Sequence, residues 1–321
     1  MKTVIITGAG FNIDSFAYID RLQEDVRYPS VHDLAAICFP DKKVDEIASI
    51  EHLFQQSIDD NDWNKIKLMT ESIMKADYYL LGPDNTTENL KPYYQLLEKF
   101  SRSPILTFNY DGMVELLLHK KKKWNPADGF GVKVKYELSE RSDTIQTNMK
   151  SERKILHLHG SLYVYSLEFQ FSLPNNNEMN WMSKKNVPDF YFDPDSVSFN
   201  FIPFSRMDAG LQYIRPENRI IAPVPNKASS LKEVFIKIMY QEAEKELYDS
   251  DNVIVIGYSF AESDKGSFNT LLKILESNKT PLNIISPDAK KISERIEKEY
   301  DIKVIPLAIT FKEWADKKFL L

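Results

Sequence analysis

Short apolar runs alternate with longer stretches of helical periodicity along most of the chain. A short apolar run suits a strand that is buried on both faces of a parallel sheet. Such runs occur at 3–7, 105–108, 155–158, 220–222, 253–256, 282–285 and 304–307. Helix-like stretches lie between them, at 44–58, 63–80, 90–100, 231–248, 265–276, 289–299 and 311–317. This alternation predicts an α/β fold with a Rossmann-like, doubly wound parallel sheet, in one domain covering residues 1–321.

Two stretches interrupt the alternation. Residues 30–100 are almost wholly helix-like, which is far more than one crossover between two strands requires. Residues 161–215 are rich in Asn, Pro and aromatic residues and show no clear helical period. We therefore expect a helical insertion or cap at 30–100, and an irregular insertion at 161–215 that covers a cleft or meets a partner.

Small and polar residues follow the predicted strands. In an open α/β sheet, ligands bind beyond the carboxyl ends of the strands, near the point where the strand order reverses. The residues that the successive strands deliver there are Gly8, Ala9, Gly10, Phe11 and Asn12; Asn109 and Asp111; His157, His159 and Ser161; Asn226 and Lys227; Gly257, Tyr258 and Ser259; and Ser286 and Asp288. Each group alone has an ordinary explanation as a tight turn, a helix cap or a structural histidine. Their gathering at one edge predicts a binding site.

The chemistry of these residues suits a dinucleotide that is cleaved rather than reduced. The backbone N–H groups of Gly8 to Phe11 are candidates for cradling a pyrophosphate, and Ser286 and Asp288 for accepting hydrogen bonds from a ribose. A carboxamide such as Asn109 can hold a ribose hydroxyl or a water, and a histidine can take its proton. Hydride transfer is disfavoured because the third glycine of G-x-G-x-x-G is replaced by Ile13.

Composition narrows the classes of protein further. Hydrophobic residues make up 43% and charged residues 27% of the chain, as in ordinary soluble proteins. No apolar run approaches the ~18 residues that span a bilayer, and no signal peptide is evident, so we expect a cytoplasmic protein. The net charge of −6 argues against nucleic-acid coating. Cys38 is the only cysteine, which excludes a zinc ribbon and predicts no metal site built on thiolates.

Four segments carry a resemblance to a known family. TGAGFNID, TFNYDGMVE, LHLHGSLY and VIVIGYSFAESD, in this order, resemble the sirtuin superfamily, and more closely its bacterial sirtuin-like NAD-hydrolase branch than the protein deacylases. The resemblance extends from residue 3 to about residue 290. Each segment alone is a weak signal, whereas four of them in register at four strand ends are more specific.

The resemblance implies a role for each matched position. It makes Gly8, Ala9 and Gly10 the NAD phosphate loop, with Phe11 and Asn12 completing it. It makes Asn109 the residue that contacts the nicotinamide ribose and positions the nucleophile, Asp111 the residue on the nicotinamide carboxamide side, and His159 the catalytic histidine. The remaining NAD contacts that it implies are Gly257, Tyr258 and Ser259 for the phosphate and adenine ribose, and Ser286 and Asp288 for the adenosine end.

The sequence departs from the deacylases in two places. Deacylases carry two C-x-x-C pairs in a zinc module, which Cys38 alone cannot supply. They also carry a Gly-Ile-Pro-x-Phe-Arg segment after the first loop, where this chain has SFAYIDR at 15–21. Both departures disfavour deacylation.

The resemblance therefore implies an NAD⁺ glycohydrolase that releases nicotinamide and ADP-ribose, as the NAD-depleting effector of a bacterial anti-phage defence system. It implies NAD⁺ as the substrate, no metal, and activation by a protein partner encoded nearby or by homo-oligomerisation. The alternative is a non-enzymatic module that binds NAD or ADP-ribose and signals to a partner. A nucleotide-dependent oxidoreductase and a deacylase are the weaker hypotheses.

Overall fold

A six-stranded parallel sheet forms the centre of the protein. The computed structural model describes residues 1–43, 47–81, 88–136, 150–171, 180–181, 190–192, 213–220, 223–225, 227 and 234–321. The strand order is β13-β12-β11-β1-β4-β6, and every neighbouring pair is parallel. The bounds are β1 (Thr3–Thr7), β4 (Ile105–Thr107), β6 (Ile155–His157), β11 (Asn252–Ile256), β12 (Leu282–Ile285) and β13 (Val304–Leu307). The predicted fold class, a Rossmann-like doubly wound sheet, is confirmed.

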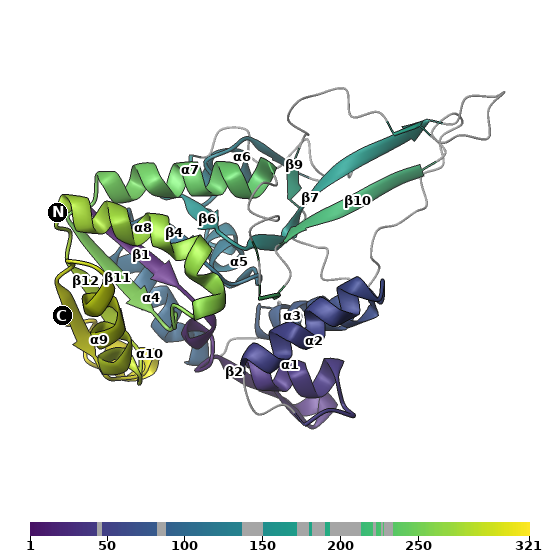
Figure 1. Ribbon diagram of the computed structural model, residues 1–321, viewed down its shortest axis with the longest axis horizontal. Helices are drawn as coiled ribbons and strands as arrows, with labels where there is room; N and C mark the ends of the chain where they lie inside the picture. The colour runs from purple at the N-terminus through teal and green to yellow at the C-terminus, as the bar shows by residue number, and fades with distance from the viewer. Residues whose placement is uncertain are drawn as a thin grey trace.

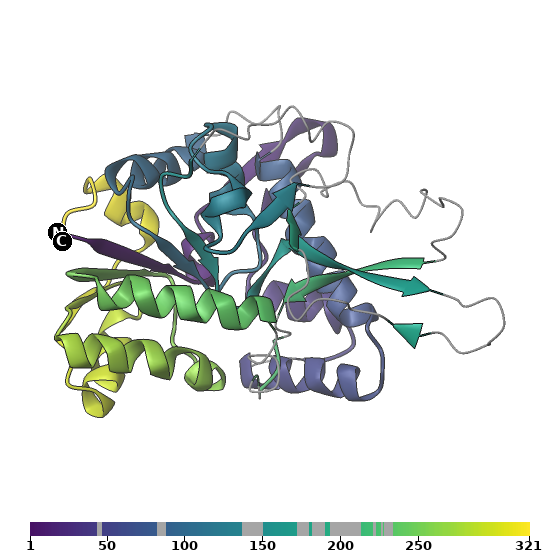
Figure 2. The same ribbon diagram turned by 90° about the horizontal axis from the view of Figure 1, so that it is seen from above.

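Helices cover both faces of this sheet. Figures 1 and 2 show α7 (Val234–Tyr248) and α8 (Lys265–Asn278) on one face, and α4 (Lys91–Lys99) and α5 (Met113–Lys120) on the other. The remaining C-terminal helices are α9 (Ala289–Glu299) and α10 (Phe311–Asp316), and α6 (Pro126–Gly129) is a single turn. Burial on both faces explains why β1, β4, β6, β11 and β12 are mostly apolar and have every residue buried.

The strand order reverses between β1 and β11. From β1 the chain continues to β4 and then β6 on one side, whereas β11, β12 and β13 follow one another on the other side. A ligand cleft is expected at such a reversal, beyond the carboxyl ends of the strands. The loops after β1 and β11 therefore lie at the centre of the candidate site.

Residues 30–100 contain four of the α-helices in the described part of the chain. They are α1 (Val31–Cys38), α2 (Ile47–Asp59), α3 (Asn64–Leu81) and α4. Ser30 begins α1 with a capping box, because its side chain accepts from the Asp33 N–H and the Asp33 carboxylate accepts from the Ser30 N–H. A hairpin of β2 (Phe16–Ile19) and β3 (Glu24–Arg27) precedes α1. We call α1 to α3 with this hairpin the helical cap.

The segment 161–215 differs from the expectation. Its described residues belong to a second sheet, of order β10-β7-β9-β5, with the short β8 paired to β7. The strands are β5 (Val134–Tyr136), β7 (Gly160–Phe171), β8 (Asn180–Trp181), β9 (Phe190–Phe192) and β10 (Tyr213–Ile220). In Figure 1, β7 and β10 form a long antiparallel pair that extends away from the parallel sheet. Residues 172–179, 182–189 and 193–212 lie outside the described residues.

One predicted parallel strand is also wrong. Ile220, the first residue of the expected strand 220–222, pairs antiparallel with Gly160 at the end of β10, and residues 221–222 lie outside the described part. The physical reason is that three apolar residues in a row do not distinguish a parallel strand from the end of a hairpin.

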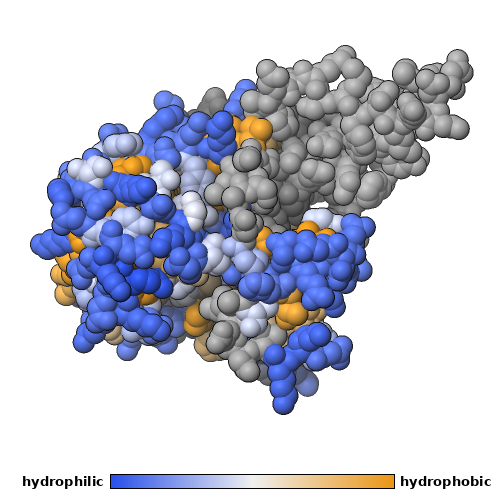
Figure 3. Space-filling model, in the orientation of Figure 1, coloured by the Kyte–Doolittle hydropathy of each residue, from blue (hydrophilic) through white to orange (hydrophobic). Residues whose placement is uncertain are grey.

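The visible surface of the parallel-sheet body is mostly hydrophilic, with small hydrophobic spots (Figure 3). Among the described residues, no helix is long and apolar enough to cross a membrane.

Candidate functional site

The ends of the parallel strands lie in one register line. Thr7 pairs with Thr107 on one side and with Ile256 on the other, Thr107 pairs with His157, and Ile256 pairs with Ile285. The predicted site residues follow these five positions by at most five residues each. The sheet therefore brings the residues delivered after β1, β4, β6, β11 and β12 to a single edge.

The glycine loop after β1 is bonded to the loop after β11. The Gly8 N–H donates to the Ile256 carbonyl at 3.1 Å, and the Gly10 N–H donates to the Gly257 carbonyl at 2.9 Å. The Phe11 N–H closes the short 3₁₀ helix η1 (Ala9–Phe11) by donating to the Gly8 carbonyl at 2.9 Å. These three N–H groups are already engaged, which differs from the expectation that the loop would turn them toward a pyrophosphate.

The glycines are required by the contact between these two loops. A Cβ atom on Gly8 would lie 2.7 Å from the Tyr258 Cα, and one on Gly10 would lie 2.9 Å from the Gly257 Cα. Gly257 has φ +62°, and a Cβ atom there would lie 2.2 Å from the Phe11 nitrogen. Only glycine permits so close an approach of two backbones. The spacing of the glycines thus reflects the packing of two loops at the point where the strand order reverses. Ile13, which stands in place of a third glycine, is 54% exposed.

A pocket of about 370 Å³ opens beside these loops. It brings together five of the predicted cofactor-binding residues, namely Gly10, Gly257, Ser259, Ser286 and Asp288. Lys291 and Arg295 of α9 add basic side chains to its lining. Arg295 also fixes one wall, because its Nη2 donates to the Ser259 carbonyl at 2.5 Å and to the Phe260 carbonyl at 2.8 Å. The lining also includes Asp14 and apolar residues such as Ile292, so it combines apolar surface with a few charged and polar groups, as small-molecule sites commonly do.

Two predicted cofactor contacts have their rings in the core instead. The Phe11 ring packs edge-on against Tyr93. The Tyr258 ring stacks on Phe108, with centroids 4.0 Å apart and an interplanar angle of 3°, and its hydroxyl donates to Asp264. Both residues are at most 5% exposed, and both rings pack against other aromatic rings of the core.

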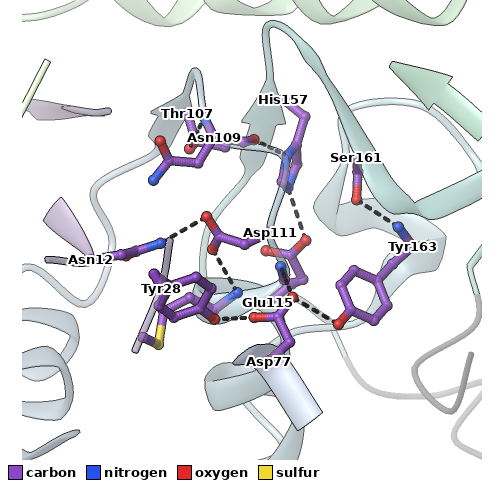
Figure 4. Close-up of polar contacts among 12 residues, drawn as sticks. Asn12, Tyr28, Asp77, Thr107, Asn109, Asp111, Glu115, His157, Ser161 and Tyr163 are labelled. Carbon is purple, nitrogen blue, oxygen red and sulfur yellow. Dashed lines mark hydrogen bonds and ion pairs between the residues drawn. The ribbon is translucent and has the colours of Figure 1, made fainter. Parts of the chain in front are cut away.

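Asn109 is held from both sides. Its Nδ2 donates to the Gly8 carbonyl at 3.2 Å, which connects the end of β4 to the glycine loop. Its own carbonyl lies 3.2 Å from Nδ1 of His157 (Figure 4). This arrangement orients the Asn109 carboxamide at the edge of the sheet, where the side chain remains partly exposed.

His157 is a fully buried structural histidine. Its Nε2 lies 2.9 Å from Oε1 of Glu115 on α5, and both side chains are at most 1% exposed. Burial lowers the pKa of His157, but the Glu115 carboxylate outweighs burial and the pKa is raised overall. Both ring nitrogens lie near oxygen atoms of the protein, namely the Asn109 carbonyl and the Glu115 carboxylate. His157 therefore supports Asn109 rather than facing a substrate.

His159 is also buried, but its electrostatic environment differs from that of His157. Its ring packs edge-on against Phe108 at 5.0 Å, and its Nε2 lies 3.6 Å from Oδ1 of Asp264 without a hydrogen bond to any described residue. Burial lowers the pKa of His159 to about 4, with Asp264 opposing that shift and Lys227 adding to it. The ring is consequently neutral at pH 7, which is the form that accepts a proton.

Asp111 is buried and bonded within the protein. One carboxylate oxygen accepts from Nδ2 of Asn12 at 2.7 Å, and the other accepts from the Met113 N–H at 3.0 Å. Burial raises the pKa of Asp111 to about 6, with Glu115 adding to the rise and the two hydrogen bonds opposing it. Oδ1 of Asn12 is buried and accepts no hydrogen bond from the described residues. Asn12 is thus the neighbour of Asp111 that retains an open acceptor.

Several buried polar residues of the site were not predicted. Asp77 of α3 accepts hydrogen bonds from the hydroxyls of Tyr28 and Tyr163 and from the Gly112 N–H (Figure 4). Glu115 had a signal in the sequence, because it is the one acidic residue of the otherwise apolar MVELLL. Asp77 and Asp264 had none, because their partners are distant in the sequence. Among the described residues, no group of three His, Cys, Asp or Glu is arranged to hold a metal ion.

Comparisons with known proteins give structural matches alone. No family model and no curated protein matches the chain. A structure described as the basis for the mechanism and regulation of Sir2 enzymes is 15% identical, with a TM-score of 0.46, over 99% of this chain and 90% of that one. A Sir2 homologue in complex with NAD is 15% identical, with a TM-score of 0.43, over 99% and 88%. A Sir2 homologue mutant with ADP-ribose is 16% identical, with a TM-score of 0.45, over 99% and 90%. At these values the function has to be argued from the chain's own residues.

Proposed function

We propose that this protein is an NAD⁺ glycohydrolase. The observation that carries the proposal is the placement of Asn109 and His159 two residues beyond the paired positions Thr107 and His157 of adjacent strands. Asn109 contacts the glycine loop through the Gly8 carbonyl, and Gly10 of that loop lines the pocket. An oriented carboxamide and a neutral imidazole at one sheet edge are the groups that hydrolysis of a glycosidic bond to a good leaving group requires.

The proposed reaction replaces nicotinamide by water at C1′ of the ribose. The bond between C1′ and the pyridinium nitrogen breaks, and its electron pair neutralises the departing nicotinamide. Asn109 holds the ribose hydroxyl or the attacking water, in an orientation set by its bond to Gly8. His159 accepts the proton that water loses. The adenosine end occupies the pocket around Ser259, Ser286 and Asp288.

We place this activity in a bacterial anti-phage system, where the protein depletes cellular NAD⁺ once a protein partner or its own oligomerisation activates it. This part of the proposal rests on the resemblance of the four sequence segments. The low basicity of the buried His159 agrees with a protein that is weakly active until triggered.

The test is nicotinamide release by the activated complex, copurified from its native operon. Asn109→Ala and His159→Ala are each expected to lower the rate at least ~100-fold, which is the usual contribution of a positioned acid–base group. His32→Ala is the matched control, because His32 is an exposed histidine of α1. Full cleavage by both site variants would contradict the mechanism.

The second candidate is a non-enzymatic NAD or ADP-ribose sensor. It is favoured by one observation, namely that Nε2 of His159 has no hydrogen-bonding partner among the described residues to fix the ring for catalysis. Measurable NAD⁺ binding together with no nicotinamide release, with or without the partner, would support the sensor.

A further inference from the structure

Two basic side chains approach the same oxygen atom of Asp264. Nζ of Lys227 is ion-paired with Oδ1, and Nε2 of His159 lies 3.6 Å from that same Oδ1. The other oxygen, Oδ2, accepts the Tyr258 hydroxyl at 3.1 Å. Lys227 therefore holds the oxygen that His159 would need, and His159 stays beyond hydrogen-bonding distance of it.

The cluster is buried and joins distant segments of the chain. The Lys227 side chain is 6% exposed, and its Nζ lies 3.6 Å from Oε1 of Glu51 on α2 of the helical cap. Asp264 ends the short 3₁₀ helix η6 (Glu262–Asp264) and precedes α8. A lysine is rarely so deeply buried unless it is paired, and pairing is stronger where water is excluded. The ion pair thus connects the helical cap to the immediate surroundings of His159.

We propose that Asp264 is the positioning residue of His159 and that Lys227 is a built-in competitor for it, so that the described arrangement is the resting state of the site. When Lys227 leaves Oδ1, the Nε2–H of His159 donates to that oxygen, which fixes the ring and leaves the Nδ1 lone pair as the proton acceptor. The proposal rests on the proposed function in one respect, the role of His159 as the base.

The chemistry of imidazole supports this division of roles. A neutral imidazole carries one N–H and one lone pair, and a carboxylate bonded to the N–H fixes the tautomer and raises the basicity of the other nitrogen. Lys227 in the ion pair cancels the charge of Asp264 and withholds that effect. Among the described residues, the groups that face His159 or its carboxylate include Asp264, Lys227, Tyr258, Tyr110 and Tyr240, with Glu51 behind Lys227. Lys227 is the basic one among them.

The first test needs no substrate. Protein labelled with ¹⁵N-histidine is compared by NMR as wild type, Lys227→Met and Lys227→Met with Asp264→Asn. Lys227→Met is expected to convert the neutral His159 ring to the Nε2–H tautomer and to raise its pKa by about one unit or more toward the ordinary 6.5. In the double variant, we expect neither the change of tautomer nor the rise in the pKa of His159. Lys154→Met is the matched control, because Lys154 is paired with Glu242 and Glu246 instead.

An unchanged tautomer and pKa in Lys227→Met would overturn the proposal. If Lys227→Met does not fold, Asp264→Asn alone is the second variant, because it retains the volume of the side chain. In the activated complex, it should lower kcat for nicotinamide release at least ~10-fold with little change in KM, and an unchanged kcat would also overturn the proposal.

The activity of isolated Lys227→Met separates this proposal from the proposed function. We expect its nicotinamide release to rise at least ~10-fold over the isolated wild type. If the NMR changes occur and no form of the protein releases nicotinamide, the proposed function fails while the competition for Asp264 stands. If the activated wild type releases nicotinamide and the NMR changes do not occur, the competition for Asp264 is contradicted while the proposed function stands.

Discussion

Among single residues, Gly257 is the position where the surrounding backbone leaves the least room for a side chain. Its φ of +62° and the 2.2 Å from an added Cβ to the Phe11 nitrogen make any other residue strained. We expect Gly257→Ala to lower the free energy of unfolding by roughly 3 kcal/mol, measured by urea denaturation. Gly266→Ala is the control, because a Cβ there meets nothing within 4 Å in helix α8, and it should stabilise by up to about 1 kcal/mol. Equal effects of the two substitutions would contradict this explanation.

Gly8 and Gly10 also show how much of the site can be predicted from the sequence. The sequence predicted correctly that Gly8 and Gly10 end a strand at the switch point. It could not predict what they approach, because Gly257 is about 250 residues away and becomes their neighbour only when β1 pairs with β11. The same limit applies to the partners of His159, since Lys227 and Asp264 belong to separate segments that the fold brings together.

Among the helices and strands, Asp77 connects α3 of the helical cap to β7 of the second sheet and to the start of α5. From α3 it accepts hydrogen bonds from Tyr28, from Tyr163 of β7 and from the Gly112 N–H at the start of α5. Asp77→Ala leaves these donors buried without an acceptor, so we expect a loss of roughly 3 kcal/mol in the free energy of unfolding. Asp59→Ala, at the exposed end of α2, should change it by less than about 0.5 kcal/mol. A loss at Asp77 no larger than at Asp59 would show that the connection is weak.

Elements differ in how well the sequence predicts them. The parallel strands are short and mostly apolar, so the pattern located β1, β4, β6, β11, β12 and the partly buried β13. Strand β7 was missed, although Ser166-Leu167-Glu168-Phe169-Gln170-Phe171 alternates with the period of two that a strand requires. The Asn- and Pro-rich residues that follow obscured this signal.

At the scale of the whole molecule, buried acids make stability depend on pH. The pKa of Asp111 is raised to about 6, so between pH 4 and pH 6 the folded protein binds more protons there than the unfolded chain does. Its contribution to stability is therefore complete below pH 4 and is lost as the pH rises through 6. The pKa of Asp77 is also raised, chiefly by burial and by Asp111, and its effect has the same sign.

Asp111→Asn should remove the part of this dependence that belongs to Asp111. On acidification from pH 7.5 to pH 5, the wild type should gain about 1 kcal/mol of stability relative to the variant. Urea unfolding curves recorded for both proteins at several pH values measure the difference. Parallel pH dependences would mean that the Asp111 carboxyl titrates normally.

The close backbone contact between the loop after β1 and the loop after β11 has a consequence for genetics. A clash with a side chain can be relieved by trimming that side chain, so a damaging substitution often has a second-site suppressor. The atoms nearest to a Cβ on Gly257 are the Phe11 nitrogen and the carbonyl carbon and Cα of Gly10, all of them backbone. No exchange of amino acids at those positions removes them. A selection for revertants of Gly257→Ala should therefore return glycine at 257 itself.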